Sequence, residues 1–232
     1  MKHTILKALA VSALVAGGIA ATSQIALAGS KTYRVTVANA TGGQPLAPGL
    51  LITHNSSFSL FQVNAAPSLG LATMAETGDP SVLAGEVSGA PGVSAAEVLV
   101  GSGAGAPVAL PGETNSRLIT ASGNAKYFSA AGMLAATNDA VYAVRGVRLP
   151  KHGKITVHAA AYDAGSEANN EIGTDIPAVG GNVGDPGVDN GDGEGFIHIH
   201  RGVHGGVDLD PATHDWRNPV VEITIERVSG HN

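Results

Sequence analysis

Two carboxylates lie four residues apart in the segment Asp163-Ala164-Gly165-Ser166-Glu167, which directly follows the strand-like run 154–162. A hard cation such as calcium binds several oxygen atoms, and a flexible turn with this spacing can supply them. Acidic residues beside a glycine are also common in ordinary solvated turns. The segment therefore predicts either a calcium-binding loop or a plain turn at the end of a strand.

A second acidic segment runs from Gly184 to Glu194 and also contains Asp189 and Asp192. Its residues do not match the EF-hand loop, which has glycine at position 6 and glutamate at position 12 after the first aspartate. Two interpretations remain open. The segment is either a solvated, glycine-rich loop or a second, weaker calcium site formed by Asp189, Asp192 and Glu194.

Three histidines close together suggest a different chemistry. His198 and His200 alternate in the run 196–200, and His204 follows four residues later. Residues i and i+2 of a strand share one face, so two imidazoles could reach one ion there. Zinc and copper bind such nitrogen ligands. The alternative is a polar strand face that binds no metal.

Short strands are the main elements expected to position these residues. Alternation of apolar and polar side chains predicts a half-buried first strand over 32–37 and a last strand over 221–226. A helical stretch is expected to open at Pro67-Ser68 and end at Gly78, and Asp79-Pro80 is typical of the start of a second helix. The remaining predicted strands are 50–54, 58–63, 117–120, 127–134, 140–147, 154–158 and 196–200.

The composition supports the same fold class. Only 14% of residues are charged and glycine occurs 32 times, which suits a turn-rich β protein better than a helical bundle. We therefore predict an all-β, antiparallel β-sandwich with a short, partly helical insertion over 64–90.

The N-terminus has the features of a secretory signal peptide. Lys2 and Lys7 precede an apolar run, and Ala26-Leu27-Ala28 forms a cleavage site before Gly29. We expect residues 1–28 to be removed, leaving a single domain over 29–232 that is secreted or periplasmic in a bacterium. The chain contains no cysteine, so it folds without disulfides.

The net charge of the chain bears on which partners it could bind. Cleavage removes two of the 13 basic residues and none of the 19 acidic ones, which leaves 11 basic residues and a net charge of −8. An acidic chain of this kind is not expected to bind nucleic acid, nor to bind membranes directly. Nucleophile-elbow, zincin and phosphate-loop motifs are absent from the sequence, so we do not expect an enzyme; an uncharacterised hydrolase is the less favoured alternative.

The order of several motifs resembles the spondin domain. His54-Asn55-Ser56-Ser57-Phe58 is followed by Met74-Ala75-Glu76-Thr77-Gly78-Asp79-Pro80, then by the 163–167 loop, and finally by Ile225-Glu226-Arg227. The resemblance covers about residues 31–228. It implies a C2-like β-sandwich with calcium bound in loops at one end. By this resemblance Asp163 and Glu167 occupy ligand positions, with Glu167 where the family has Asp, and Asp139 is the third acidic ligand.

The resemblance gives the functional expectation. We expect an exported calcium-binding module for adhesion or interaction with an unknown protein or glycan ligand at the cell envelope or outside the cell. The alternative is a periplasmic transition-metal-binding protein that uses His198, His200 and His204.

Overall fold

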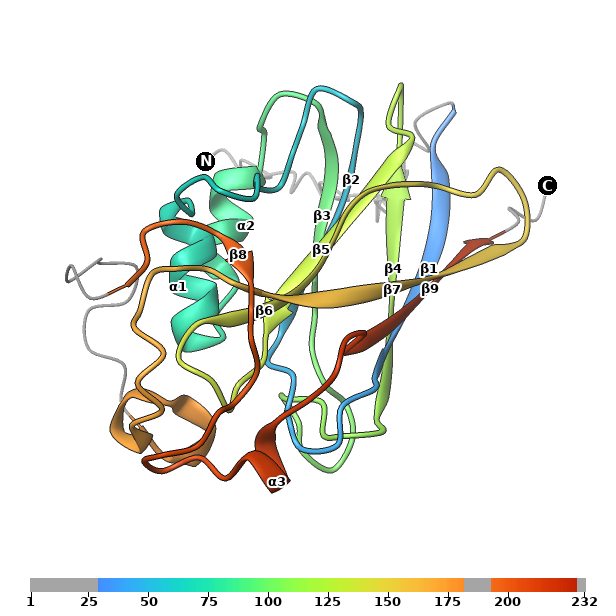
Figure 1. Ribbon diagram of the computed structural model, residues 1–232. Coiled ribbons are helices and arrows are strands. Elements are labelled where there is room, and N and C mark those ends of the chain that lie inside the picture. The colour runs from blue at the N-terminus through green and yellow to red at the C-terminus, as the bar shows by residue number, and fades with distance from the viewer. Residues whose placement is uncertain (1–28, 182–192, 229–232) are drawn as a thin grey trace, which may run out of the picture.

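The computed structural model describes residues 29–181 and 193–228 (Figure 1). The predicted signal peptide lies outside the described residues, as do Asp189 and Asp192 of the predicted second calcium site. Within the described part, no helix is long and apolar enough to cross a membrane.

Nine antiparallel strands dominate the described part of the chain, which confirms the all-β prediction. The order of neighbouring strands is β3-β2-β5-β6-β7-β9-β1-β4, and β8 pairs with β7. The strands are β1 Lys31–Asn39, β2 Gly49–His54, β3 Val93–Leu99, β4 Thr114–Ala121, β5 Tyr127–Met133, β6 Ala140–Arg148, β7 Lys154–Asp163, β8 His198–Ile199 and β9 Val221–Val228.

Strand β7 belongs to two layers, and this makes the fold a sandwich. Its first part, Lys154–Ala159, pairs with β9, and its last part pairs with β6 from Ala160 to Asp163. One layer therefore contains β4, β1, β9 and the start of β7. The other contains β3, β2, β5, β6 and the end of β7, where β8 is added. The long β7 crosses the molecule in Figure 1.

The main core lies between these layers. Alternate residues of β1 (Tyr33, Val35 and Val37) are buried, as are Ile223 and Ile225 of β9, and they pack against side chains of β2, β5 and β6. The side chains between them in sequence are more exposed. The period-2 pattern of both strands is therefore confirmed, because one face of each strand meets the opposite layer.

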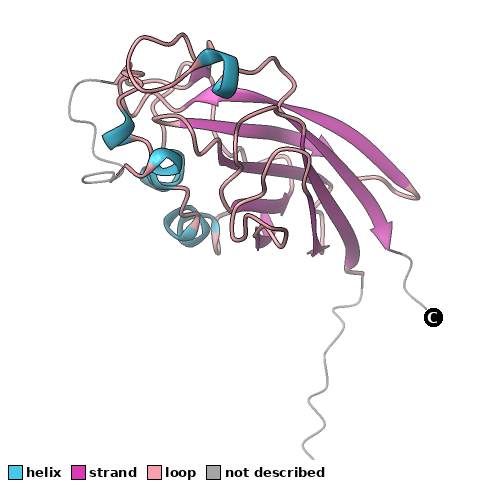
Figure 2. Ribbon diagram, turned by 90° about the horizontal axis from the view of Figure 1, so that it is seen from below, coloured by secondary structure: helices cyan, strands magenta, loops and turns pink. Residues whose placement is uncertain are grey.

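The predicted helical insertion is also confirmed. Helix α1 (Leu69–Thr77) and helix α2 (Ser81–Val87) lie together on one side of the strands (Figure 2). Their apolar side chains form a second core with the outer faces of β2, β5 and β6. The hydroxyl of Ser68 caps α1, and Gly78 ends it at φ 73°, a left-handed conformation that favours glycine.

Some local predictions differ from the structure. Residues 58–63 form a loop and not a strand; Phe61 there is buried against Tyr162, with ring centroids 5.2 Å apart. Strand β3 occurs where no strand is predicted, and β8 has two residues instead of five. Helix α2 begins one residue later than expected, with Asp79 accepting a hydrogen bond from the Ser81 amide. The described residues also form three short helical turns: Gly173–Asp175, Pro177–Val179 and α3 Pro211–His214.

Candidate metal site

Strand pairing brings the acidic residues together at one end of the second layer. Asp163 is the last residue of β7, and its Cα partners are Ala140 on one side and His198 on the other. Asp139 directly precedes Ala140, and its carbonyl accepts a hydrogen bond of 3.2 Å from the Ala164 amide. Residues far apart in the sequence are thus held at neighbouring register positions by β6, β7 and β8.

Asp139 is fully buried and only half satisfied. Its Oδ2 accepts hydrogen bonds from the amides of Ser166 at 2.8 Å and Glu167 at 3.1 Å, which hold the loop after β7 in place. Its Oδ1 is buried without a hydrogen-bond partner. Burial, and secondly the charge of Asp163, raises the pKa of Asp139 to about 8. A buried carboxylate oxygen of this kind is costly unless the group is protonated or a cation is bound to it.

Asp163 is also buried, and its position is closely defined. Its Oδ1 accepts a hydrogen bond of 2.8 Å from the Gly165 amide, and its Oδ2 one of 2.6 Å from Asn169 Nδ2. Burial raises the pKa of Asp163. Gly165 has φ +70°, and a Cβ atom there would lie 2.4 Å from the carbonyl oxygen of Phe196. The glycine therefore allows this loop to pack against the segment that carries Glu194 and His198.

Glu194 and His198 complete a group of possible ligands with Asp163. One ligand atom from each of the three lies within 4.8 Å of the others. His198 Nε2 is 3.8 Å from Asp163 Oδ1 and 4.0 Å from Glu194 Oε2, which is too long for hydrogen bonds. His198 Nδ1 lies 3.1 Å from the carbonyl of Ile199, which only accepts, so Nδ1 carries a proton. In the neutral ring, the lone pair of Nε2 then faces both carboxylates and can bind a metal.

Glu167 belongs to the same acidic region, but its side chain has other neighbours. Its amide binds Asp139, whereas the charges that raise its pKa to about 7, after burial, are those of Glu76 and Asp175. Of the predicted calcium ligands, the structure thus places Asp139 and Asp163 side by side. Glu194, predicted from the sequence for a separate site, is the carboxylate grouped with Asp163.

The three histidines have different partners within the described residues. His200 is buried with both ring nitrogens occupied: Nδ1 accepts from the Gly202 amide at 2.9 Å, so Nε2 donates to Asn169 Oδ1 at 2.9 Å. Burial, followed by the charge of His198, lowers the pKa of His200 to about 4. His204 contacts the carboxylate of Glu171 instead. His198 Nε2 and His200 Nε2 both lie within 4 Å of an Asp163 carboxylate oxygen, at 3.8 and 3.9 Å. His200 uses that nitrogen to position Asn169, which in turn holds Asp163, so of the two His198 is the histidine whose Nε2 has no hydrogen-bond partner of this kind among the described residues.

The site has an excess of negative charge. Asp139, Asp163, Glu167 and Glu194 have no ion pair with lysine or arginine within the described residues. Clustered carboxylates repel one another, and either protons or a metal cation relieves that repulsion. The oxygen atoms suit calcium, and the added imidazole also suits zinc.

Comparison with known proteins adds no family to this description. No protein-family model matches the chain, and no curated protein matches it.

Proposed function

We propose that this protein is an exported, calcium-binding β-sandwich module that serves adhesion or ligand interaction and has no catalytic role. The observation that carries this proposal is the unpartnered, buried Oδ1 of Asp139 beside Asp163. Calcium is preferred because Asp139, Asp163 and Glu194 together offer hard oxygen atoms in loops at a strand end. A divalent cation there would replace the protons that the raised pKa values otherwise retain.

We further propose membership of the spondin domain family, with a protein or glycan ligand at the cell envelope. Three features support it: the order of motifs along the sequence, the antiparallel strands with their helical insertion, and the acidic cluster at one end of the second layer. The signal-peptide pattern of residues 1–28 supports the proposed location in the periplasm or outside the cell.

A second candidate function is transition-metal binding by Asp163, Glu194 and His198. The orientation of His198 favours it, because the Nδ1 contact with the Ile199 carbonyl directs a free Nε2 lone pair toward the carboxylates. Second contacts of this kind commonly orient histidine ligands of zinc. His200 and His204 are not part of this smaller site.

Calorimetric titration of chelator-stripped protein with Ca²⁺ and with Zn²⁺ tests the two candidates. Calcium binding that is lost in Asp139→Asn and retained in His198→Gln supports the first. Tighter zinc binding that is lost in His198→Gln supports the second. Glu222→Gln, an exposed carboxylate change on β9, is the matched control. Absence of heat with both metals would mean that the proposed function is wrong.

A further inference from the structure

The opposite end of the molecule is basic. Lys126, Arg148, Lys151 and Lys154 are exposed there, together with Lys31 at the start of β1. None of these five has an ion-pair partner within the described residues. We call this set of five side chains the basic end.

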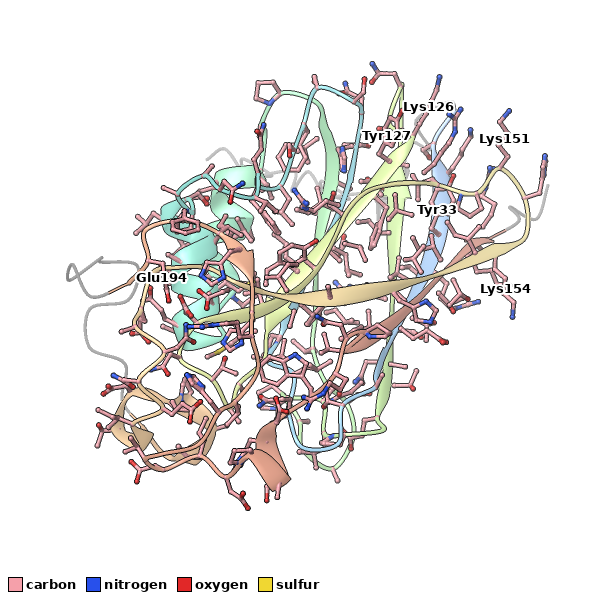
Figure 3. The ribbon with its side chains drawn as sticks, viewed as in Figure 1. Tyr33, Lys126, Tyr127, Lys151, Lys154 and Glu194 are labelled. Atoms are coloured by element: carbon pink, nitrogen blue, oxygen red, sulfur yellow. The ribbon has the colours of Figure 1, made fainter. Side chains whose placement is uncertain are left out.

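Strand register gathers these side chains at one place. Tyr127, next to Lys126, is the Cα partner of Arg148, and the Leu149 amide donates to the Lys126 carbonyl at 2.9 Å. Lys151 lies in the turn between β6 and β7, and Lys154 begins β7. In Figure 3, Lys126, Lys151 and Lys154 lie toward one end of the molecule, and Glu194 lies toward the other.

The charge at the basic end therefore differs in sign from the net charge of the whole chain. Glu226 is the single acidic residue among the described strand ends and turns that form the basic end, and Arg34 lies 3.3 Å from it. The net negative charge that argued against membrane binding comes from acidic residues that lie elsewhere in the chain. Overall composition hides this separation, because it averages over both ends of the molecule.

We propose that the basic end docks onto an anionic lipid bilayer. Five long, unpaired cations on strand ends and turns match an extended surface of negative headgroups. A glycan partner would favour an exposed aromatic ring for stacking, but Tyr33 is buried and Tyr127 stacks on His54 with ring centroids 6.1 Å apart. Attachment is electrostatic, without apolar insertion, so it weakens as salt increases.

Docking in this way fixes the orientation of the module. The acidic cluster is repelled by an anionic surface, while the basic end is attracted to it, and both forces turn the molecule in the same sense. The candidate metal site would then point away from the bilayer, where a soluble ligand or a second surface can reach it. The attraction of the basic end to the bilayer does not depend on metal binding; a bound cation would only reduce the repulsion of the acidic cluster.

Vesicle sedimentation tests the proposal. The protein, with its N-terminus verified by intact mass, is mixed in EDTA and low salt with vesicles of phosphatidylcholine alone or with added phosphatidylglycerol. We expect binding only to the anionic vesicles. The triple variant Lys126→Gln, Lys151→Gln, Lys154→Gln should reduce partitioning by about 100-fold, since each basic residue near such a surface contributes about fivefold.

The matched control removes the same charge elsewhere, by Arg117→Gln, Arg201→Gln and Arg217→Gln, and should change partitioning far less. Equal losses in the two triple variants would overturn the proposal, because only net charge would then matter. Equal binding to uncharged vesicles, binding that requires calcium, or binding to soluble polygalacturonate without binding to vesicles would also overturn it. Melting temperatures of both variants verify that they are folded.

Discussion

Substituting Asp139 by asparagine should stabilise the metal-free protein while removing its affinity for calcium. Asparagine resembles the protonated carboxyl in shape. Its oxygen can replace Oδ2 as acceptor for the Ser166 and Glu167 amides, and its NH₂ then occupies the place of the unpartnered Oδ1. The NH₂ group at that place would repel a bound cation. Because asparagine does not ionise, the folded state of the variant no longer has to retain a proton at residue 139.

The magnitude follows from the raised pKa. At pH 7 the unfolded chain has released the Asp139 proton, whose ordinary pKa is 3.8, whereas the folded chain retains it because its pKa is about 8. This difference costs the metal-free folded state at most about 4 kcal/mol at pH 7, at about 1.4 kcal/mol per pH unit. Because local rearrangement reduces that cost, we expect a gain of about 2–4 kcal/mol, or about 5–15 °C in melting temperature.

Thermal unfolding in EDTA at pH 7, followed by circular dichroism, measures this gain, and repeating it with saturating calcium measures the loss of metal binding. Wild type should gain stability with calcium by mass action, and Asp139→Asn should not. Glu222→Gln should change neither quantity by more than about 0.5 kcal/mol, as expected for an exposed position. A lower metal-free melting temperature for Asp139→Asn, or an undiminished calcium shift, would refute the reasoning.

Three further predictions concern pH, support of the site and packing. The raised pKa values of Asp139 (about 8) and Glu167 (about 7) mean that the folded state binds more protons than the unfolded state. Stability of metal-free protein should therefore fall as pH rises from 6.5 to 8 in a series of melting curves, and calcium should flatten that dependence. Asn169→Ala, which removes the 2.6 Å hydrogen bond to the Asp163 carboxylate, should weaken calcium binding about 10-fold or more in calorimetry while leaving circular dichroism unchanged. Leu71→Ala, in the fully buried face of α1, should cost about 2–5 kcal/mol in urea unfolding, whereas Leu69→Ala, at a side chain that is 57% exposed, should cost much less.

Local patterns made much of the fold predictable. Apolar and polar residues alternate in β1 and β9 because one face of each strand packs against the core. Ser68 and Gly78 are residue types that favour the start and the end of a helix, and they mark the ends of α1. Strand β3 lacks this alternation of apolar and polar residues. Its residues from Val93 to Ala96 are all partly buried, and small or polar side chains interrupt the apolar ones. Residues 58–63 misled for the opposite reason: apolar side chains there cover the outer face of the second layer as a loop.

The candidate site was predictable only in part. The motif order pointed to Asp139 and Asp163, and the acidic segment 184–194 pointed to Glu194, but for a separate site. The sequence has no signal that joins Glu194 to Asp163, 31 residues away, because the pairing of β7 with β8 brings them together. The histidine pattern predicted that His198 and His200 would share one side, and both imidazoles do approach Asp163, but the sequence contains no indication of the hydrogen bonds that occupy His200. Here β8 ends at Ile199, and His200 is held by Gly202 and Asn169.

Anomalous diffraction from crystals soaked in Mn²⁺ tests the central claim most directly, since manganese accepts both carboxylate and imidazole ligands. We predict one peak in bonding contact, about 2–2.5 Å, with a carboxylate oxygen of Asp163 and with Asp139 Oδ1 or His198 Nε2. A data set in which manganese occupies other places, and the carboxylates of Asp139 and Asp163 have none beside them, would contradict the account.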